Sequence, residues 1–200
     1  MKLYKVSPTL LDSFRSVQGK TCWQKEPEEL IKQVKGIYEP SAAMIRGGSI
    51  HKYLETMDSD LMEEEKIQLK DFAMQFIGAS KELRLRVRLN NEIVMSVVID
   101  ALLGNIVHEY KTGGRFYGVD TFDNSLQWRM YLLAVDSPKV VYHHFEYTDN
   151  RPMRFTYRTF CFYPYQDMKA DIERCSYEFI DWCKTNNLEK FITIEDDSIF

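Results

Sequence analysis

The chain has 200 residues, of which 44% are hydrophobic and 28% charged, and its net charge is −4. This length suits one domain with a buried core, which we expect to span residues 1–200. The charge excludes an overall basic surface for nucleic acid, although a local basic face would suffice. No run approaches the roughly 18 apolar residues of a membrane helix, and the N-terminus lacks the apolar run of a signal peptide. Four scattered cysteines without a CxxC pair indicate a reducing, cytoplasmic setting.

The N-terminal part of the chain, residues 7–79, carries the signatures of helices. Ser7 followed by Pro8 is typical of an N-cap and a first helical residue, and this helix would end near Val17. Three more segments are expected to be helices, on features such as acids at the start, lysines toward the end or an apolar stripe. They are Glu28–Lys35, Ser41–Glu55 and Leu61–Ile77.

After residue 82 the period changes to that of strands. The segment "ELRLRVRLNNEIVMSVVIDALLG" alternates apolar and polar residues, pauses at Asn90-Asn91 and resumes as a nearly continuous apolar run. This pattern predicts a β-hairpin whose second strand is buried. Gly104-Asn105 is another turn signal, so "IVHEYK" would be a third strand that ends before two glycines.

The remaining chain alternates helical and strand-like segments. Phe122–Val135 is expected to be a helix, "KVVYHHFEY" and "RFTYRTFCFY" are expected to be strands, and Tyr165–Lys184 should form a long amphipathic helix. We therefore expect an α/β fold: a central mixed β-sheet flanked by helices. Its sheet and one helix would lie within residues 82–148, and a last strand and helix within residues 153–186.

Two acids and a lysine form the most informative constellation. Asp100 ends a buried apolar run, where an acid is costly unless it is paired or bound to a cation. The turn at Gly104 would bring it close to Glu109, and Glu109 and Lys111 point to the same face of a strand. Carboxylates hold Mg²⁺ or Mn²⁺, such an ion activates water, and a lysine can orient that water. Phosphodiester hydrolysis fits this set, although a Glu–Lys pair on a solvated sheet face is the plainer alternative.

Four segments, in order, resemble the motifs of the PD-(D/E)XK nuclease superfamily, specifically its RecB-like branch, which includes the Cas4 and AddB nucleases and many phage exonucleases. "RGGSIHKYLE" resembles its glycine–x–x–x–histidine helix, "VVIDALLG" its aspartate strand, "VHEYKTG" its acid–x–lysine strand and "LQWRMYLLAV" its glutamine–x–x–x–tyrosine helix. "SPTLLDSFRSVQGKTCW" is similar to the family's opening helix. One departure is Val97, where the family has a small residue.

The resemblance implies a restriction-endonuclease-like core and a role for each matching residue. His51, Asp100, Glu109 and the backbone carbonyl of Tyr110 would bind Mg²⁺ or Mn²⁺, as two ions, and Lys111 would be the catalytic lysine. A nitrogen ligand makes Mn²⁺ at least as suitable as Mg²⁺. The helix pair would either touch DNA or support the lysine, because its two members lie one helical turn apart. This pair is Gln127 and Tyr131.

A row of arginines alternates with apolar residues in the first strand of the hairpin. The row consists of Arg84, Arg86 and Arg88. It would be either a solvated sheet face or a strip that binds DNA phosphates and compensates for the acidic total.

Other chemistry-bearing residues carry weaker signals. The chain has as many cysteines as an iron–sulfur cluster needs as ligands, but their spacing is not the usual one. They are Cys22, Cys161, Cys175 and Cys183. We do not expect such a cluster, because Cys175 and Cys183 share a helix face that suits core burial. His143 and His144 point to opposite faces of a strand, so they cannot readily share a metal ion.

The chain is expected to act as a divalent-metal-dependent DNA exonuclease on ends or single strands, in DNA repair, recombination or phage DNA processing. It would work in the cytoplasm, or in that of the host if it is phage-encoded. The alternatives are a structure-specific or Cas4-type endonuclease and a non-catalytic DNA-binding accessory subunit. The tail "IEDDSIF" resembles that of single-stranded DNA-binding proteins and would dock such a protein or a recombination protein, unless it is a frayed end. The oligomeric state stays open.

Overall fold

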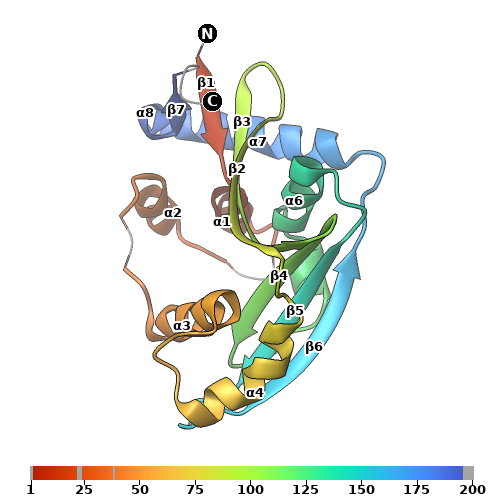
Figure 1. Cartoon of the computed structure of the whole chain (residues 1–200). Coiled ribbons are helices and arrows are strands. Elements are labelled where there is room, and N and C mark those ends of the chain that lie inside the picture. The colour runs from red at the N-terminus through yellow and green to blue at the C-terminus, as the bar shows by residue number, and fades with distance from the viewer. Residues whose placement is uncertain (1, 22–23, 38, 196–200) are drawn as a thin grey trace.

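The structure is a computed structural model that describes residues 2–21, 24–37 and 39–195 (Figure 1). Its strands are β1 (Leu3–Val6), β2 (Ser80–Arg88), β3 (Ile93–Leu103), β4 (Ile106–Gly113), β5 (Val140–Tyr147), β6 (Phe155–Phe162) and β7 (Thr193–Ile194). Its helices are α1 (Pro8–Val17), α2 (Pro27–Val34), α3 (Ala42–Thr56), α4 (Glu63–Met74), α5 (Asp120–Asp123), α6 (Gln127–Val135), α7 (Met168–Thr185) and α8 (Glu189–Ile192).

The strands form one mixed sheet in the order β6-β5-β4-β3-β1-β7, and β2 pairs with β3 outside this path. β1 runs parallel to β3 and β4 parallel to β5, whereas the other pairings are antiparallel. Helices flank the sheet, with α7 crossing its β1 end and α3 and α4 lying together at the other end (Figure 1). The predicted α/β fold with a central mixed sheet and flanking helices is confirmed.

The central feature of the sheet is the place where β3 and β4 part. Their ladder runs only from the pair Leu103–Ile106 to the pair Ala101–His108. Beyond it, β3 stays with β2 and then with β1, while β4 turns toward β5. The positions directly past the fork are Asp100 and Glu109, so the topology opens the sheet at the two predicted acids.

Two hydrophobic clusters hold the helices on the sheet. The larger one packs α1, α2, α6 and α7 against β3 and β4, with Phe14, Ile99 and Phe179 fully or almost fully buried in it. The second packs α3 and α4 on β4 and β5 around Tyr110 and Phe145. The first cluster supports the helix that carries Gln127 and the second supports the helix that carries His51, so the site is held from both sides.

Most expected elements are present, and their ends are explained by local chemistry. Ser7 caps α1 by accepting a hydrogen bond from the N–H of Leu10 at 3.4 Å, and Pro8 is the first helical residue, as predicted. The single helix expected over 122–135 was wrong: α5 and α6 are separated at residues 124–126. The break exists because Asp12 binds the chain there, as described below. β1, α8 and β7 were not predicted from the sequence.

None of the helices among the described residues is long and apolar enough to cross a membrane.

Candidate active site

Asp100 lies at the fork between β3 and β4. The β3–β4 ladder has ended there, so the backbone N–H of Tyr110 has no backbone partner on β3. It donates instead to the Asp100 side chain, at 2.7 Å from Oδ2. The carboxylate is only 13% exposed. Burial acts to raise its pKa, but His51 and the Tyr110 N–H outweigh burial and hold the pKa below its usual value. Asp100 is therefore an ionised carboxylate that is fixed to both arms of the fork.

Helix α3 places His51 beside that carboxylate. The helix lies close on β4 because Gly47 faces Thr112: a Cβ at Gly47 would come within 2.7 Å of Thr112 Oγ1. His51 Nδ1 then lies 3.7 Å from Asp100 Oδ1. Burial acts to lower the pKa of His51, but Asp100 outweighs it and the pKa is raised. The glycine–x–x–x–histidine spacing thus has a steric reason in this chain, since Gly47 allows the approach and His51 uses it.

Glu109 and Lys111 lie on the other arm of the fork. Lys111 Nζ donates to Glu109 Oε1 at 2.8 Å, and the Glu109 side chain is 4% exposed. Burial, together with the charge of Asp100, raises the pKa of Glu109 to about 7, and Lys111 opposes that rise only in part. Burial acts to lower the pKa of Lys111, but Glu109 outweighs it, so the ammonium group stays protonated.

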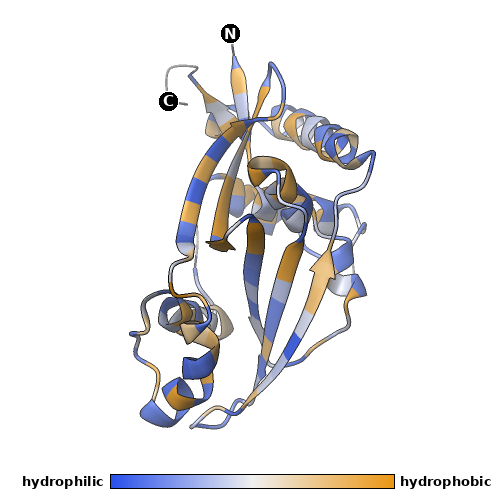
Figure 2. Cartoon of the chain, turned by 45° about the vertical axis from the view of Figure 1, so that its right-hand side comes forward, coloured by the Kyte–Doolittle hydropathy of each residue, from blue (hydrophilic) through white to orange (hydrophobic). Residues whose placement is uncertain are grey.

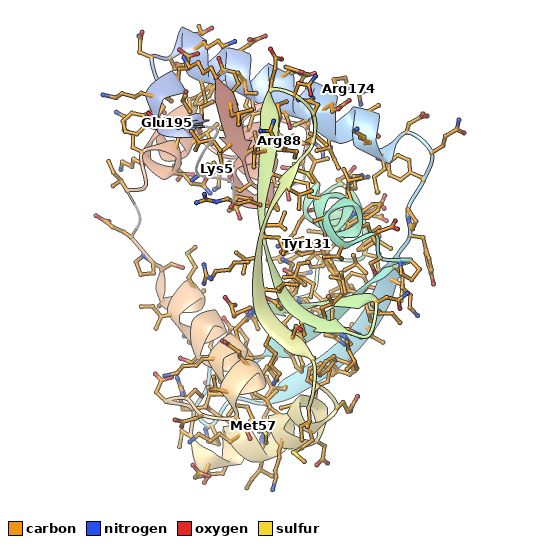
Figure 3. The ribbon with its side chains drawn as sticks, turned by 45° about the horizontal axis from the view of Figure 1, so that its top comes forward. Lys5, Met57, Arg88, Tyr131, Arg174 and Glu195 are labelled. Atoms are coloured by element: carbon orange, nitrogen blue, oxygen red, sulfur yellow. The ribbon has the colours of Figure 1, made fainter. Side chains whose placement is uncertain are left out.

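Gln127 is the second anchor of the lysine. Lys111 Nζ donates to Gln127 Oε1 at 2.5 Å, and the Tyr142 hydroxyl donates to the same oxygen at 3.4 Å. Gln127 Nε2 donates to the Tyr131 hydroxyl at 2.7 Å, which fixes the amide orientation. Tyr131, which belongs to α6, is 2% exposed and lies near the middle of the molecule (Figure 3). Of the two roles expected for this helix pair, support of Lys111 fits the buried Tyr131.

Asp12 of α1 belongs to this network and was not predicted from the sequence. It accepts the Leu126 N–H at 2.7 Å and the Ser125 hydroxyl, and the Gln127 N–H donates to Ser125 Oγ at 3.0 Å. Burial raises the pKa of Asp12, although both hydrogen bonds act against the rise. Asp12 thus fixes the start of α6, from which Gln127 reaches Lys111. The available signal was an acid directly after Leu11, in a helix with a buried face.

The donor set can be tested against a divalent ion. Among the described residues no three His, Cys, Asp or Glu side chains form a ready-made metal cluster. Glu109 Oε2, however, is a buried oxygen with no hydrogen-bond partner in that part of the chain, which is costly unless something binds it. Two carboxylates, the His51 imidazole and the Tyr110 carbonyl are donors that suit Mg²⁺ or Mn²⁺. The residues therefore fit the ion, and the ligand set stays a prediction.

The site opens to the surface on two sides. A cavity of about 390 Å³, here called the Lys111 cavity, is lined by polar side chains of α1 and the α5–α6 junction together with Lys25, Lys111 and Gln127. A second one of about 480 Å³, the His51 cavity, lies between α3 and the end of β4. Each is large enough for a small polar group. The buried carboxylates thus lie deep in the molecule, with the lysine facing one opening and the histidine the other.

The predicted arginine row is exposed along β2, and Figure 2 shows the alternation as hydrophilic and hydrophobic bands. Its first member, Arg84, forms an ion pair of 3.1 Å with Glu82. Glu82 has a left-handed backbone (φ 48°), which is unusual for a residue other than glycine. Burial raises the pKa of Glu82, and the charge of Asp100 adds to the rise. The row therefore ends close to the candidate site.

The basic row extends at its far end onto β1. Lys5 and Arg88 pair with Val94 of β3 from opposite sides, so their side chains share a face of the sheet. Both are labelled in the upper part of the molecule in Figure 3. Lys5 was not predicted as part of the row, because nothing in its neighbourhood indicated a strand.

The remaining candidates lie elsewhere. Cys175 and Cys183 are buried in the larger core cluster on α7, as expected, and Cys22 lies outside the described residues. His143 stacks on His108 and Tyr157, whereas His144 contacts Phe116, so the two adjacent histidines do face different clusters. Of the expected docking tail, residues 196–200 lie outside the part that the structure describes.

Comparison with known proteins gives a fold relationship. No protein-family model matches the sequence, and no curated protein does. A candidate exonuclease from Eubacterium rectale resembles this chain with a TM-score of 0.60 and 10% identity, and the match covers 93% of this chain and 82% of the exonuclease. For an alkaline exonuclease from Laribacter hongkongensis, the match covers 93% of this chain and 90% of the exonuclease, with a TM-score of 0.56 and 15% identity. Its complex with dAMP covers the same shares, with a TM-score of 0.55 and 16% identity. The chain therefore shares the overall fold of these two exonucleases.

Proposed function

We propose that the chain is a divalent-metal-dependent deoxyribonuclease that hydrolyses phosphodiester bonds as an exonuclease. The observation that carries the proposal is the arrangement at the fork: an ionised Asp100 beside His51, and a buried Glu109 that shares a protonated lysine with Gln127. A protonated lysine held by two side chains is poised to donate to a charged oxygen. The fold shared with two exonucleases supports the proposal, as does the dAMP bound to one of them.

Mg²⁺ or Mn²⁺ held by Asp100, Glu109, His51 and the Tyr110 carbonyl would neutralise phosphate charge and supply an activated water. The protein's own residues do the rest. Lys111 orients the attacking water and stabilises the charge that develops on the phosphate oxygens. Gln127 keeps the ammonium group aimed at that position, and Asp12 holds the turn from which Gln127 extends.

The exposed arginines of β2 are proposed to bind the DNA backbone. Together with Lys5 they form a basic row on a chain of net charge −4, and Arg84 at one end is ion-paired with Glu82 beside the site. Such a row binds phosphates without reading the base sequence. We propose DNA repair, recombination or phage DNA processing as the context.

Incubation of the protein with end-labelled linear duplex, closed circular duplex and single-stranded DNA tests the function. We expect the linear and single-stranded substrates to be degraded in Mg²⁺ or Mn²⁺ and to remain intact in EDTA, while the closed circle stays intact. Cleavage of the circle would instead identify an endonuclease. Absence of cleavage of every substrate in both metals, combined with DNA binding, would identify a non-catalytic accessory subunit. Calorimetric titration with Mn²⁺ separates these cases further, because a non-catalytic relative need not bind the ion.

A further inference from the structure

A groove continues from the candidate site across the end of β4. Two cavities share residues 112–114: the His51 cavity and a neighbouring one of about 490 Å³ that reaches Arg115 and Tyr117. We call the second the Tyr117 cavity. Both are lined by these three residues, so they adjoin at the end of β4, and we call the two together the groove. It begins at a proposed metal ligand and ends at an exposed aromatic ring.

The floor and one wall of this groove are built from glycines. A Cβ added at Gly114 or at Gly48 of α3 would meet no atom within 4 Å, so each faces open space. Neither has a left-handed backbone that would require glycine. Because the two glycines have no side chains, they leave space in which the backbone of a polymer can approach the protein closely.

The far end of the groove is an aromatic ring beside a guanidinium group. The guanidinium carbon of Arg115 lies 5.3 Å from the centre of the Tyr117 ring, and Tyr117 is 57% exposed. Between them, Phe116 points inward and packs against His144 and Phe160 at 5.0 and 6.0 Å. The inward ring anchors the loop, so its two neighbours are presented outward.

The charges along the groove favour an anionic partner. Asp149 lines the Tyr117 cavity, but it is ion-paired with Arg46 at 3.0 Å. Arg158 lies over the Phe116 ring at 5.1 Å and pairs with Glu146. Arg115 adds its guanidinium group at the surface.

We propose that this groove binds unpaired nucleotides of the DNA strand, with one base stacked on Tyr117 and the sugar–phosphate chain passing over residues 113–114 toward His51. The inference rests on the proposed function and narrows its substrate to single strands or frayed ends. A base in a duplex has its faces covered by its neighbours, whereas an unpaired base offers a face to an aromatic side chain. The burial of the carboxylates also favours a single-stranded substrate. Glu109 is only 4% exposed, and a single strand enters a narrow groove more readily than a duplex does.

Binding of a fluorescent single-stranded oligonucleotide in EDTA, where no cleavage is expected, tests the proposal. Tyr117→Ala should weaken binding about tenfold or more, Tyr117→Phe should bind like the unmodified protein, and blunt duplex binding should change less than twofold. Oligonucleotides with 2-aminopurine near either end provide a direct signal. Their fluorescence should be quenched on binding to the unmodified protein and to Tyr117→Phe, and not on binding to Tyr117→Ala.

A steric variant tests the path independently of the ring. Gly48→Leu adds a large side chain to the His51 cavity on a helix that gains propensity from losing glycine, so the fold should tolerate it. We expect it to weaken single-strand binding, while Ala42→Leu, an exposed change on the same helix, should not.

The outcomes separate this inference from the proposed function. A protein that cleaves DNA while Tyr117→Ala and Gly48→Leu bind single strands normally would overturn the groove and leave the nuclease in place. A protein that cleaves nothing, yet shows the Tyr117-dependent quenching, would overturn the nuclease and leave the groove. Equal losses of duplex and single-strand binding in Tyr117→Ala would overturn the preference for unpaired nucleotides.

Discussion

Lys111 donates a 2.5 Å hydrogen bond to Gln127, and this bond joins the β4 arm of the fork to α6. The ammonium group therefore has two oxygen acceptors, Gln127 Oε1 and Glu109 Oε1. A carboxylate alone would hold the lysine by charge, whereas the amide fixes its direction. This relationship predicts that the amide affects the rate of cleavage more than the binding of DNA.

Replacement of Gln127 by alanine should lower kcat for DNA cleavage about tenfold or more while KM changes little, because a transition-state donor is misdirected. Steady-state kinetics on a single-stranded substrate measures both constants. Gln75→Ala, an exposed change at the C-cap of α4, is the matched control and should leave them unchanged. A rise in KM at constant kcat would assign Gln127 to substrate binding instead.

Substitution of the three residues at the fork should separate ion binding from chemistry. Asp100→Ala and Glu109→Ala should each abolish both cleavage and Mn²⁺ binding, because they remove oxygen ligands. Lys111→Ala should abolish cleavage and retain Mn²⁺ binding, since an ammonium group repels the ion. Calorimetry with Mn²⁺ and cleavage of end-labelled DNA give the two readouts. Full activity in Lys111→Ala would remove that residue from the mechanism.

The part of the site that local chemistry determines was predictable from the sequence. The turn at Gly104-Asn105 sets the register of β3 and β4, and this register places Asp100 opposite Glu109. Likewise, the alternation in β2 predicted that the arginines share one exposed face.

Features that depend on distant partners were not predictable. β1 is a strand because it pairs with β3, about 90 residues later, and four residues carry too little pattern to reveal this. The break before α6 depends on Asp12, which lies 113 residues before Ser125 in the chain. The same holds for the way in which β3 and β4 part, since it follows from pairings with β1 and β5 rather than from either strand alone.

The contact between Gly47 and Thr112 predicts a pair of compensating substitutions. Gly47→Ala should destabilise the protein and weaken Mn²⁺ binding, because its Cβ would lie 2.7 Å from Thr112 Oγ1 and push α3, with His51, off β4. Adding Thr112→Ala should restore both, since the next contact is an ordinary 3.9 Å to Cβ. Gly48→Ala is the control and should stabilise the helix by about 1 kcal/mol. A double variant as weak as Gly47→Ala would contradict the steric explanation.

The buried His143 predicts how stability depends on pH. Burial, with a contribution from His108, lowers the pKa of His143 from 6.5 to about 3. Below pH 6.5 the unfolded chain takes up a proton that the folded chain does not, so the free energy of unfolding decreases as the pH falls from 7 toward 3. Between pH 7 and 5 the decrease from this residue is on the order of 2 kcal/mol. Urea unfolding at both values should show it, and His143→Gln should reduce the difference; an equal difference in both proteins would assign it to other groups.

Removal of the basic row should change the salt dependence of DNA binding more than its base preference. Arg84, Arg86 and Arg88 lie on one exposed face of β2, and each phosphate contact contributes roughly 0.7 to the slope of log affinity against log salt for single strands. Replacing all three by glutamine should therefore reduce the magnitude of that slope by about 2. Titrations of a labelled oligonucleotide at several salt concentrations measure it. The matched control replaces three exposed lysines away from β2, Lys32, Lys35 and Lys70, by glutamine; it removes the same charge and should leave the slope unchanged. An unchanged slope in the β2 variant would show that the arginines are only a solvated sheet face.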